Sequence, residues 1–156
     1  MVRDISLHGQ DRRYSHSRIG INGRLDTIQA AILLAKFEIF PDEVARRNRV
    51  GEKYTSCINT LQPSIITPEI RPNCTTVYSQ YSIMVSNREQ LINKLKKINI
   101  PTTIHYPTPI YRQPPFYVDK PNFPITEETA KKIVSLPMHP YLSLEDIEKV
   151  SQALAV

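Results

Sequence analysis

The stretch that decides the fold is Ile19-Gly-Ile-Asn-Gly-Arg-Leu-Asp-Thr-Ile-Gln-Ala-Ala-Ile-Leu-Leu-Ala-Lys-Phe-Glu-Ile-Phe40. It opens with a short loop, Gly20 to Arg24, in which glycines flank an amide and precede a guanidinium. A helix is predicted from Leu25 to Phe40, because Asp26 is a good N-cap residue and Gln29 follows at the spacing of a capping box.

The helix that follows the loop is apolar on nearly all sides. One stripe at helical spacing consists of Ile28, Ala31, Ile32, Ala35 and Ile39. Leu33, Leu34 and Phe37 make the other side apolar as well. Since such a helix is buried from more than one direction, we expect it between two layers or two subunits, with the preceding loop held at its N-terminal end.

Composition limits the class of protein. A chain of 156 residues that is 40% hydrophobic predicts one domain with a core. The net charge of +5 favours anionic partners such as nucleic acid, phosphates or acidic sugars. Two isolated cysteines and the lack of a signal peptide or a membrane-spanning run predict a cytoplasmic protein without a membrane partner. Neither a Walker loop nor a dinucleotide-binding fingerprint is present.

The N-terminal half is predicted to contain an arm and a long helix. Residues Met1 to Arg18 are polar and basic, which indicates an irregular arm or, equally, a disordered terminus. Pro41 should end the first helix, and Pro41-Asp42-Glu43 should start a second one that runs to about Leu61. The result is a long helix kinked at Pro41. Residues 62–75 contain three prolines and indicate a loop.

The C-terminal half alternates strand and helix patterns. Val77 to Val85 alternates as a strand does, and Ser86 is placed to cap a following helix. Thr102 to Tyr106 is predicted as a second strand. After a packed, proline-rich loop, Thr126 is expected to cap a helix through Ser135.

Ser143 is then expected to cap the last helix of the chain. These elements predict a small α+β domain, in which a long kinked helix accompanies a sheet of two or three strands covered by helices on one face.

Two groups of residues could carry chemistry. Asn22 and Arg24 form either a tight turn without function or an anion site at a helix entry. His105 and Tyr106 end a predicted strand, where neighbours point to opposite faces. A lone histidine is more often structural, and Arg12 with Arg13 is more simply a solvated basic arm.

Three passages resemble the DegT/StrS family of nucleotide-sugar aminotransferases, which use pyridoxal phosphate (PLP). The first passage is Gly20-Ile-Asn22-Gly-Arg24-Leu-Asp26-Thr-Ile-Gln29. The others, His8 to Tyr14 and Ile104-His-Tyr-Pro107, are similar to the branch that acts on UDP-linked 3-keto-glucuronic acid derivatives. The resemblance extends from His8 to Leu154 but corresponds only to the C-terminal portion of such an enzyme. The large domain with the PLP-linking lysine is therefore expected upstream of Met1.

The resemblance implies a fold and a division of the chain. The fold is the small C-terminal α+β domain of a fold type I PLP-dependent transferase. Residues 1–24 would be a basic arm and active-site loop, 25–61 the helix leading to the large domain, and 62–156 the small domain. The enzyme would be a homodimer with shared active sites.

The resemblance also implies roles for individual residues. Asn22 would reach the PLP phosphate of the partner subunit, and Arg24 would pair with a sugar carboxylate. His105 and Tyr106 would lie at the sugar nucleotide. Arg12 and Arg13 would lie at the mouth of the site, within reach of the UDP phosphates. No catalytic residue and no metal ligand is assigned within this chain.

The function so implied is transfer of an amino group from an amino acid, with glutamate the expected donor, to a UDP-linked keto-sugar in surface polysaccharide synthesis. The chain alone is expected to be inactive, since it lacks the lysine. The alternative is a non-catalytic regulatory or nucleic-acid-binding module, because the chain is basic and family members have been named pleiotropic regulatory proteins. Against nucleic acid, no helix-turn-helix pattern and no aromatic stacking platform accompanies the arginines.

Overall fold

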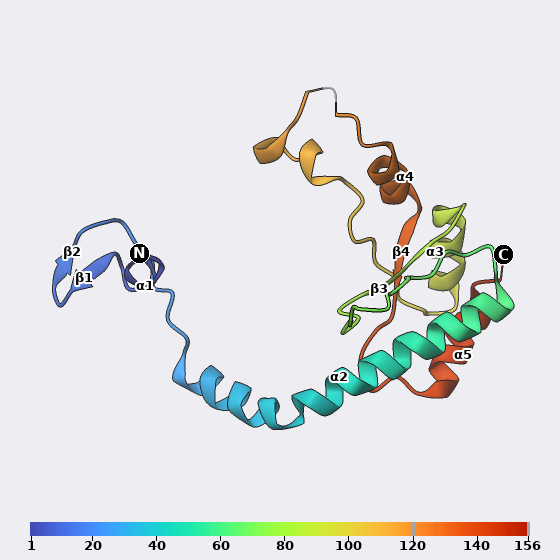
Figure 1. The fold of residues 1–156 in the computed structure, drawn as a ribbon, viewed down its shortest axis with the longest axis horizontal. Coiled ribbons are helices and arrows are strands. Elements are labelled where there is room, and N and C mark those ends of the chain that lie inside the picture. The colour runs from blue at the N-terminus through green and yellow to red at the C-terminus, as the bar shows by residue number, and fades with distance from the viewer. Residues whose placement is uncertain (120, 156) are drawn as a thin grey trace. The chain divides into compact units, whose positions relative to one another are not determined.

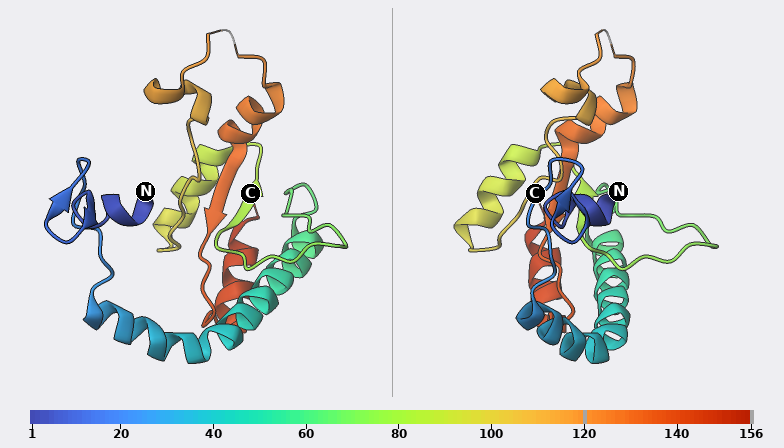
Figure 2. Two further views of the ribbon diagram at one scale, coloured as in Figure 1. Left: turned by 60° about the vertical axis from the view of Figure 1, so that its left-hand side comes forward. Right: turned by 90° about the vertical axis from the view of Figure 1, so that its left-hand side faces the viewer.

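The computed structural model describes residues 1–119 and 121–155. The chain divides into two compact units, Met1–Pro41 and Asp42–Val156. Figures 1 and 2 show their secondary structure. Each unit has its own arrangement of elements, so the two are described in turn.

The N-terminal arm is ordered by its own hydrogen bonds. Helix α1 (Val2–Ile5) precedes a small antiparallel hairpin of β1 (Gln10–Arg12) and β2 (Ser15–His16) (Figure 1). The prediction of an irregular or disordered arm is therefore wrong. The hairpin turn uses Tyr14, whose φ of 62° is rare for a residue other than glycine and gives no sequence signal.

The arm packs against the loop from Gly20 to Arg24 and holds it in place. Ile21 N–H donates to the Ile5 carbonyl at 2.8 Å, and Gly23 N–H donates to the Ser6 carbonyl at 2.8 Å. Gly20 permits this close approach, since a Cβ there would lie 2.0 Å from the backbone nitrogen of Gly9.

Helix α2 (Thr27–Leu61) is a single element of 35 residues. Asp26 caps it as predicted, because its Oδ1 accepts a hydrogen bond of 2.9 Å from Ile28 N–H. The helix does not stop at Pro41 and start again but contains this proline. Pro41 lacks an N–H and so removes one bond of the helical ladder without ending the helix.

The expected burial of the first part of α2 is not provided by the described residues. Ile28, Leu34 and Phe37 are 73%, 73% and 71% exposed. The apolar pattern is present as predicted, but nothing within the described ranges covers it.

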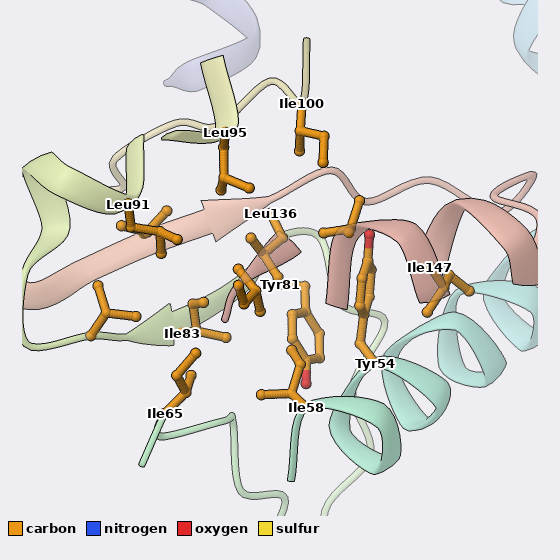
Figure 3. Packing of buried hydrophobic residues seen from close by; sticks show 14 of the residues in the cluster. Tyr54, Ile58, Ile65, Tyr81, Ile83, Leu91, Leu95, Ile100, Leu136 and Ile147 are labelled. Carbon is orange, nitrogen blue, oxygen red and sulfur yellow. The ribbon is translucent and has the colours of Figure 1, made fainter. Parts of the chain in front are cut away.

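The core of the second unit lies on one face of a two-stranded antiparallel sheet. Strand β3 (Tyr81–Met84) pairs with β4 (Ile133–Leu136), so that Tyr81 lies opposite Leu136 and Ile83 opposite Val134. These four side chains are buried against α2, α3 (Arg88–Lys97) and α5 (Leu144–Ala153) (Figure 3). The helices contribute Val50, Tyr54, Ile58, Leu91, Leu95, Ile147 and Val150. The α+β fold with helices over one face of a small sheet is confirmed.

The edges of the sheet differ from the prediction. The first strand is shorter than the predicted Val77–Val85, and Thr102 to Tyr106 contains only an isolated bridge, from Thr103 to Ser135. Strand β4 was expected to be the end of a helix. It forms a strand because Val134 and Leu136 complete the core face beside β3, and the branched side chains of Ile133 and Val134 suit a pleated surface.

Helix boundaries were partly predicted. Asn87, and not Ser86, caps α3 by accepting a 3.1 Å hydrogen bond from Gln90 N–H. Helix α4 (Pro124–Lys132) begins with a proline in its first turn, so Thr126 is not its cap. Ser143 caps α5 as predicted, accepting from Asp146 N–H at 3.0 Å. The loop before α4 contains two 3₁₀ turns, η1 (Ile110–Arg112) and η2 (Pro114–Phe116).

Candidate functional site

In the first unit, Asn22 and Arg24 are joined by a hydrogen bond. Arg24 Nη1 donates to Asn22 Oδ1 at 2.9 Å, and both side chains are exposed. A backbone bridge between Leu7 and Asn22 adds to the contacts that hold the loop. Asn22 Nδ2 makes no hydrogen bond to any residue that the structure describes. The loop therefore presents free amide and guanidinium N–H donors, which suit an anion such as phosphate or carboxylate.

Arg12 and Arg13 lie in the hairpin of the same unit. The guanidinium of Arg13 lies 5.0 Å from the ring centroid of Tyr14, and its Nη2 donates to the Tyr14 hydroxyl at 3.2 Å. Arg12 ends β1 and is exposed. Both cations are thus available at the surface, while the ring restricts the side chain of Arg13.

In the second unit, His105 and Tyr106 line one cavity of about 470 Å³. The prediction that adjacent strand residues point to opposite faces does not apply, because this segment is not a strand. Their rings meet edge to face, with centroids 5.4 Å apart. Apolar side chains and a few hydroxyl and amide groups line the rest of the cavity. The remaining lining residues are Thr108, Pro109, Ile110, Gln113, Ile125, Thr126, Thr129, Ala130 and Ile133. Its size is that of a small-molecule site.

His105 is held by a buried serine that sequence reasoning missed. Its Nδ1 lies 3.0 Å from Ser135 Oγ, which in turn lies 2.8 Å from Ser82 Oγ. Ser82 and Ser135 are paired across β3 and β4, on the face opposite the core. No sequence signal identifies this contact, since the histidine and Ser135 are thirty residues apart.

A second missed cluster holds the cavity's loop to α4. The Tyr111 hydroxyl donates to Glu127 Oε1 at 2.8 Å, and the guanidinium of Arg112 contacts the same oxygen at 2.6 Å. The hydrogen bond from Tyr111, which has the larger effect, and that from Arg112 hold the pKa of Glu127 below its ordinary value. Burial raises the pKa of Tyr111, and its bond to Glu127 raises it further. The carboxylate is therefore charged near neutral pH and fixes η1 against the first turn of α4.

The described residues bear on three features: a metal site, a membrane-spanning helix and a cofactor site. No cluster of acidic, histidine and cysteine side chains able to hold a metal ion occurs among them. No helix in the described ranges has the length and apolarity to cross a membrane. Among the described residues that line the cavity beside His105 there is no lysine. The free amide of Asn22 suits the phosphate end of a cofactor such as PLP, while none of the described groups that line the cavity suits its carbonyl end.

Solved structures place this fold among PLP-dependent aminotransferases. A DegT DnrJ EryC1 StrS aminotransferase from Brucella abortus superposes with a TM-score of 0.86 at 36% identity, over 97% of this chain and 41% of that one. The family model described as the DegT/DnrJ/EryC1/StrS aminotransferase family matches residues 1–155. The chain belongs to that family, as its sequence motifs predict.

Curated relatives include both enzymes and a protein named for regulation. The UDP-2-acetamido-2-deoxy-3-oxo-D-glucuronate aminotransferase of Pseudomonas aeruginosa is 45% identical over 98% of this chain and 42% of its own length. A pleiotropic regulatory protein of Geobacillus stearothermophilus is 33% identical, again over 98% of this chain and 42% of its own length. This chain thus spans about two fifths of the relatives it matches.

Proposed function

We propose that this chain is the C-terminal part of a PLP-dependent aminotransferase that transfers an amino group from glutamate to a UDP-linked 3-keto-sugar bearing a carboxylate. The product would feed surface polysaccharide synthesis, and the enzyme would work in the cytoplasm as a homodimer. The observation that carries this proposal is the 45% identity to the glucuronate aminotransferase over 98% of the chain. The paired donors of Asn22 and Arg24 support it independently.

The residues of this chain would bind and orient rather than carry out bond-breaking steps. Asn22 would donate its free amide N–H to the cofactor phosphate in the partner subunit's site. Arg24, which reaches from the same loop, would form a bidentate pair with the carboxylate of the sugar. PLP, when bound, supplies the electron sink for amino transfer. The chain's own contribution is position and charge.

The second unit would hold the sugar nucleotide. His105 and Tyr106 line the same cavity, so both can contact one ligand. We assign them the orientation of the sugar. The exposed guanidinium groups of Arg12 and Arg13 would meet the UDP phosphates, where a cation is favoured by charge alone.

By itself the 156-residue chain is proposed to be inactive, because no lysine occurs among the described residues that line its cavity. Incubation with PLP followed by borohydride reduction should label its lysines weakly and without preference. Stoichiometric labelling of one lysine would contradict this. The control is the family-length protein, in which one lysine should be labelled fully.

The experiment that tests the function uses the family-length protein, glutamate labelled with ¹⁵N and a UDP-linked 3-keto-sugar carboxylate. Mass spectrometry should detect the labelled amino sugar and an equal amount of 2-oxoglutarate. The regulatory alternative is not favoured, since the Brucella abortus structure and the Pseudomonas aeruginosa relative are both aminotransferases. A salt-dependent shift on a DNA gel without amino transfer would reverse that preference.

A further inference from the structure

We propose that Ser135 is a positioning residue, which with Ser82 holds His105 as the tautomer that carries its proton on Nε2. His105 would then offer a hydrogen-bond donor to the sugar nucleotide in the cavity. The identity of the ligand rests on the proposed function, whereas the tautomer of His105 is independent of that function.

The relay is built on the polar face of the sheet. Ser135 is 4% exposed and lies in the centre of β4, with its backbone paired both to Ser82 and to Thr103. Its Oγ lies 2.8 Å from Ser82 Oγ and 3.0 Å from His105 Nδ1. A buried hydroxyl has one proton and must place it on one of these two neighbours.

Two directions of donation are geometrically open, and they differ in the protons that they satisfy. If His105 donates from Nδ1, then Ser135 donates to Ser82, and the proton of Ser82 is left for solvent. If Ser82 donates to Ser135 and Ser135 donates to Nδ1, the proton on Nε2 is the one left without a partner among the described residues. Each direction thus leaves one proton to be satisfied elsewhere. The second direction is favoured because His105 lines the cavity of about 470 Å³, where water or a ligand oxygen can accept from Nε2.

The consequence for the imidazole is specific. A neutral ring that accepts at Nδ1 carries its proton on Nε2. Nε2 makes no hydrogen bond to the residues that the structure describes, whereas Nδ1 is engaged. His105 also lines the cavity of about 470 Å³. The free N–H is therefore the group available to a ligand oxygen, such as a hydroxyl or carbonyl of the sugar or an oxygen of a phosphate.

The tautomer can be measured on this chain without cofactor or substrate. Long-range ¹H–¹⁵N correlation spectra of the imidazoles identify which nitrogen carries the proton, and a His105→Gln variant assigns the signal among the four histidines. The wild-type signal should show the proton on Nε2. Ser135→Ala should mix the two tautomers, and Ser82→Ala should do so more weakly. A proton on Nδ1 in the wild type would overturn the inference.

Ser151→Ala is the matched control. Ser151 is also fully buried, but it donates to the Ile147 carbonyl within α5 at 2.7 Å. Its replacement removes a buried hydroxyl whose partner lies outside the relay and should leave the His105 signal unchanged. If Ser135→Ala also leaves it unchanged while thermal unfolding shows a native fold, Ser135 has no positioning role.

Kinetics of the family-length enzyme separate this inference from the proposed function. Ser135→Ala should raise the KM for the UDP-sugar about 3- to 10-fold, the equivalent of one neutral hydrogen bond, and change kcat less. An altered tautomer with an unaltered KM would overturn the role of His105 at the substrate. Loss of amino transfer in the wild type would instead sink the proposed function and leave the NMR result standing.

Discussion

Arg24 offers the sharpest test of substrate choice, because its guanidinium belongs to an exposed loop and not to the core. Among the described residues, its one hydrogen-bond partner is Asn22 Oδ1, at 2.9 Å. Replacement by alanine therefore leaves the packing of both units intact. The free energy of unfolding should change by less than about 0.5 kcal/mol, as for other surface substitutions.

The effect on substrate binding should be much larger and should depend on the sugar. A hydrogen bond to a charged group contributes about 1.5–3 kcal/mol. Loss of the pair with a sugar carboxylate thus predicts an increase in KM of about 10- to 150-fold. A sugar with a hydroxymethyl group in place of the carboxylate should show a far smaller increase. Arg24→Lys should restore only part of the loss, since an ammonium cannot form the bidentate pair.

The assay compares both sugars with wild type, Arg24→Ala and Arg24→Lys in the family-length enzyme. Arg18→Ala is the matched control, because Arg18 is an exposed arginine of the same arm with no assigned contact to the ligand. It removes the same charge and should affect neither KM. If Arg24→Ala raises the KM of both sugars equally, the carboxylate assignment is wrong, and Arg24 serves to hold the loop.

Three further predictions concern the fold itself. Ile58→Ala should lower the free energy of unfolding by about 2–5 kcal/mol in urea, because Ile58 is fully buried, while Ile28→Ala should change it little; equal effects would contradict the core assignment. The pKa of Glu127 is lowered from 4.5 in the folded state, so the stability that its ionised carboxylate contributes should be complete above pH 4.5 and be lost as the pH falls from there through the lowered pKa; hydrogen exchange that shows no acid loosening, or the same loosening in Glu127→Gln, would refute this. The exposed apolar surface of 25–40 should drive self-association, which light scattering should detect and Ile28→Glu should reduce; a clean monomer at high concentration would count against it.

Features fixed by neighbouring residues were predictable from sequence. The caps at Asp26 and Ser143 depend on a side chain and an N–H two or three residues away, and both were identified. Strand β4 was missed because its identity depends on Ile83 and Tyr81 of β3, some fifty residues earlier in the chain. The arm was missed because its hairpin turns at Tyr14, whose positive φ gives no sequence signal, and because its remaining order comes from backbone hydrogen bonds within the arm and to the 20–24 loop.

The candidate site also combines local features that the sequence predicts with tertiary contacts that it does not. Asn22 and Arg24 lie two residues apart, so their place in one loop follows from the motif, whereas the hydrogen bond between them was not predicted. The resemblance pointed to His105 and Tyr106. Their shared cavity was not predicted, because the sequence indicated a strand, in which neighbouring side chains point to opposite faces. The support of His105 by Ser135 is a tertiary contact between unrelated sequence positions, so no local pattern can reveal it.

The central proposal is that Asn22 completes the PLP site of the partner subunit, and mixed dimers test it most directly. One subunit carries Asn22→Ala, and the other lacks the PLP-linking lysine proposed for the N-terminal domain. In a mixed dimer, the subunit with the lysine would receive an intact Asn22 from its partner.

Mixing the two impaired homodimers should therefore restore amino transfer at one of the two sites, with wild-type KM for the UDP-sugar. Each homodimer alone is the control, and both should retain the fold. If mixed dimers form and activity does not return, Asn22 acts within its own subunit or has no contact with the cofactor, and the shared-site account is contradicted.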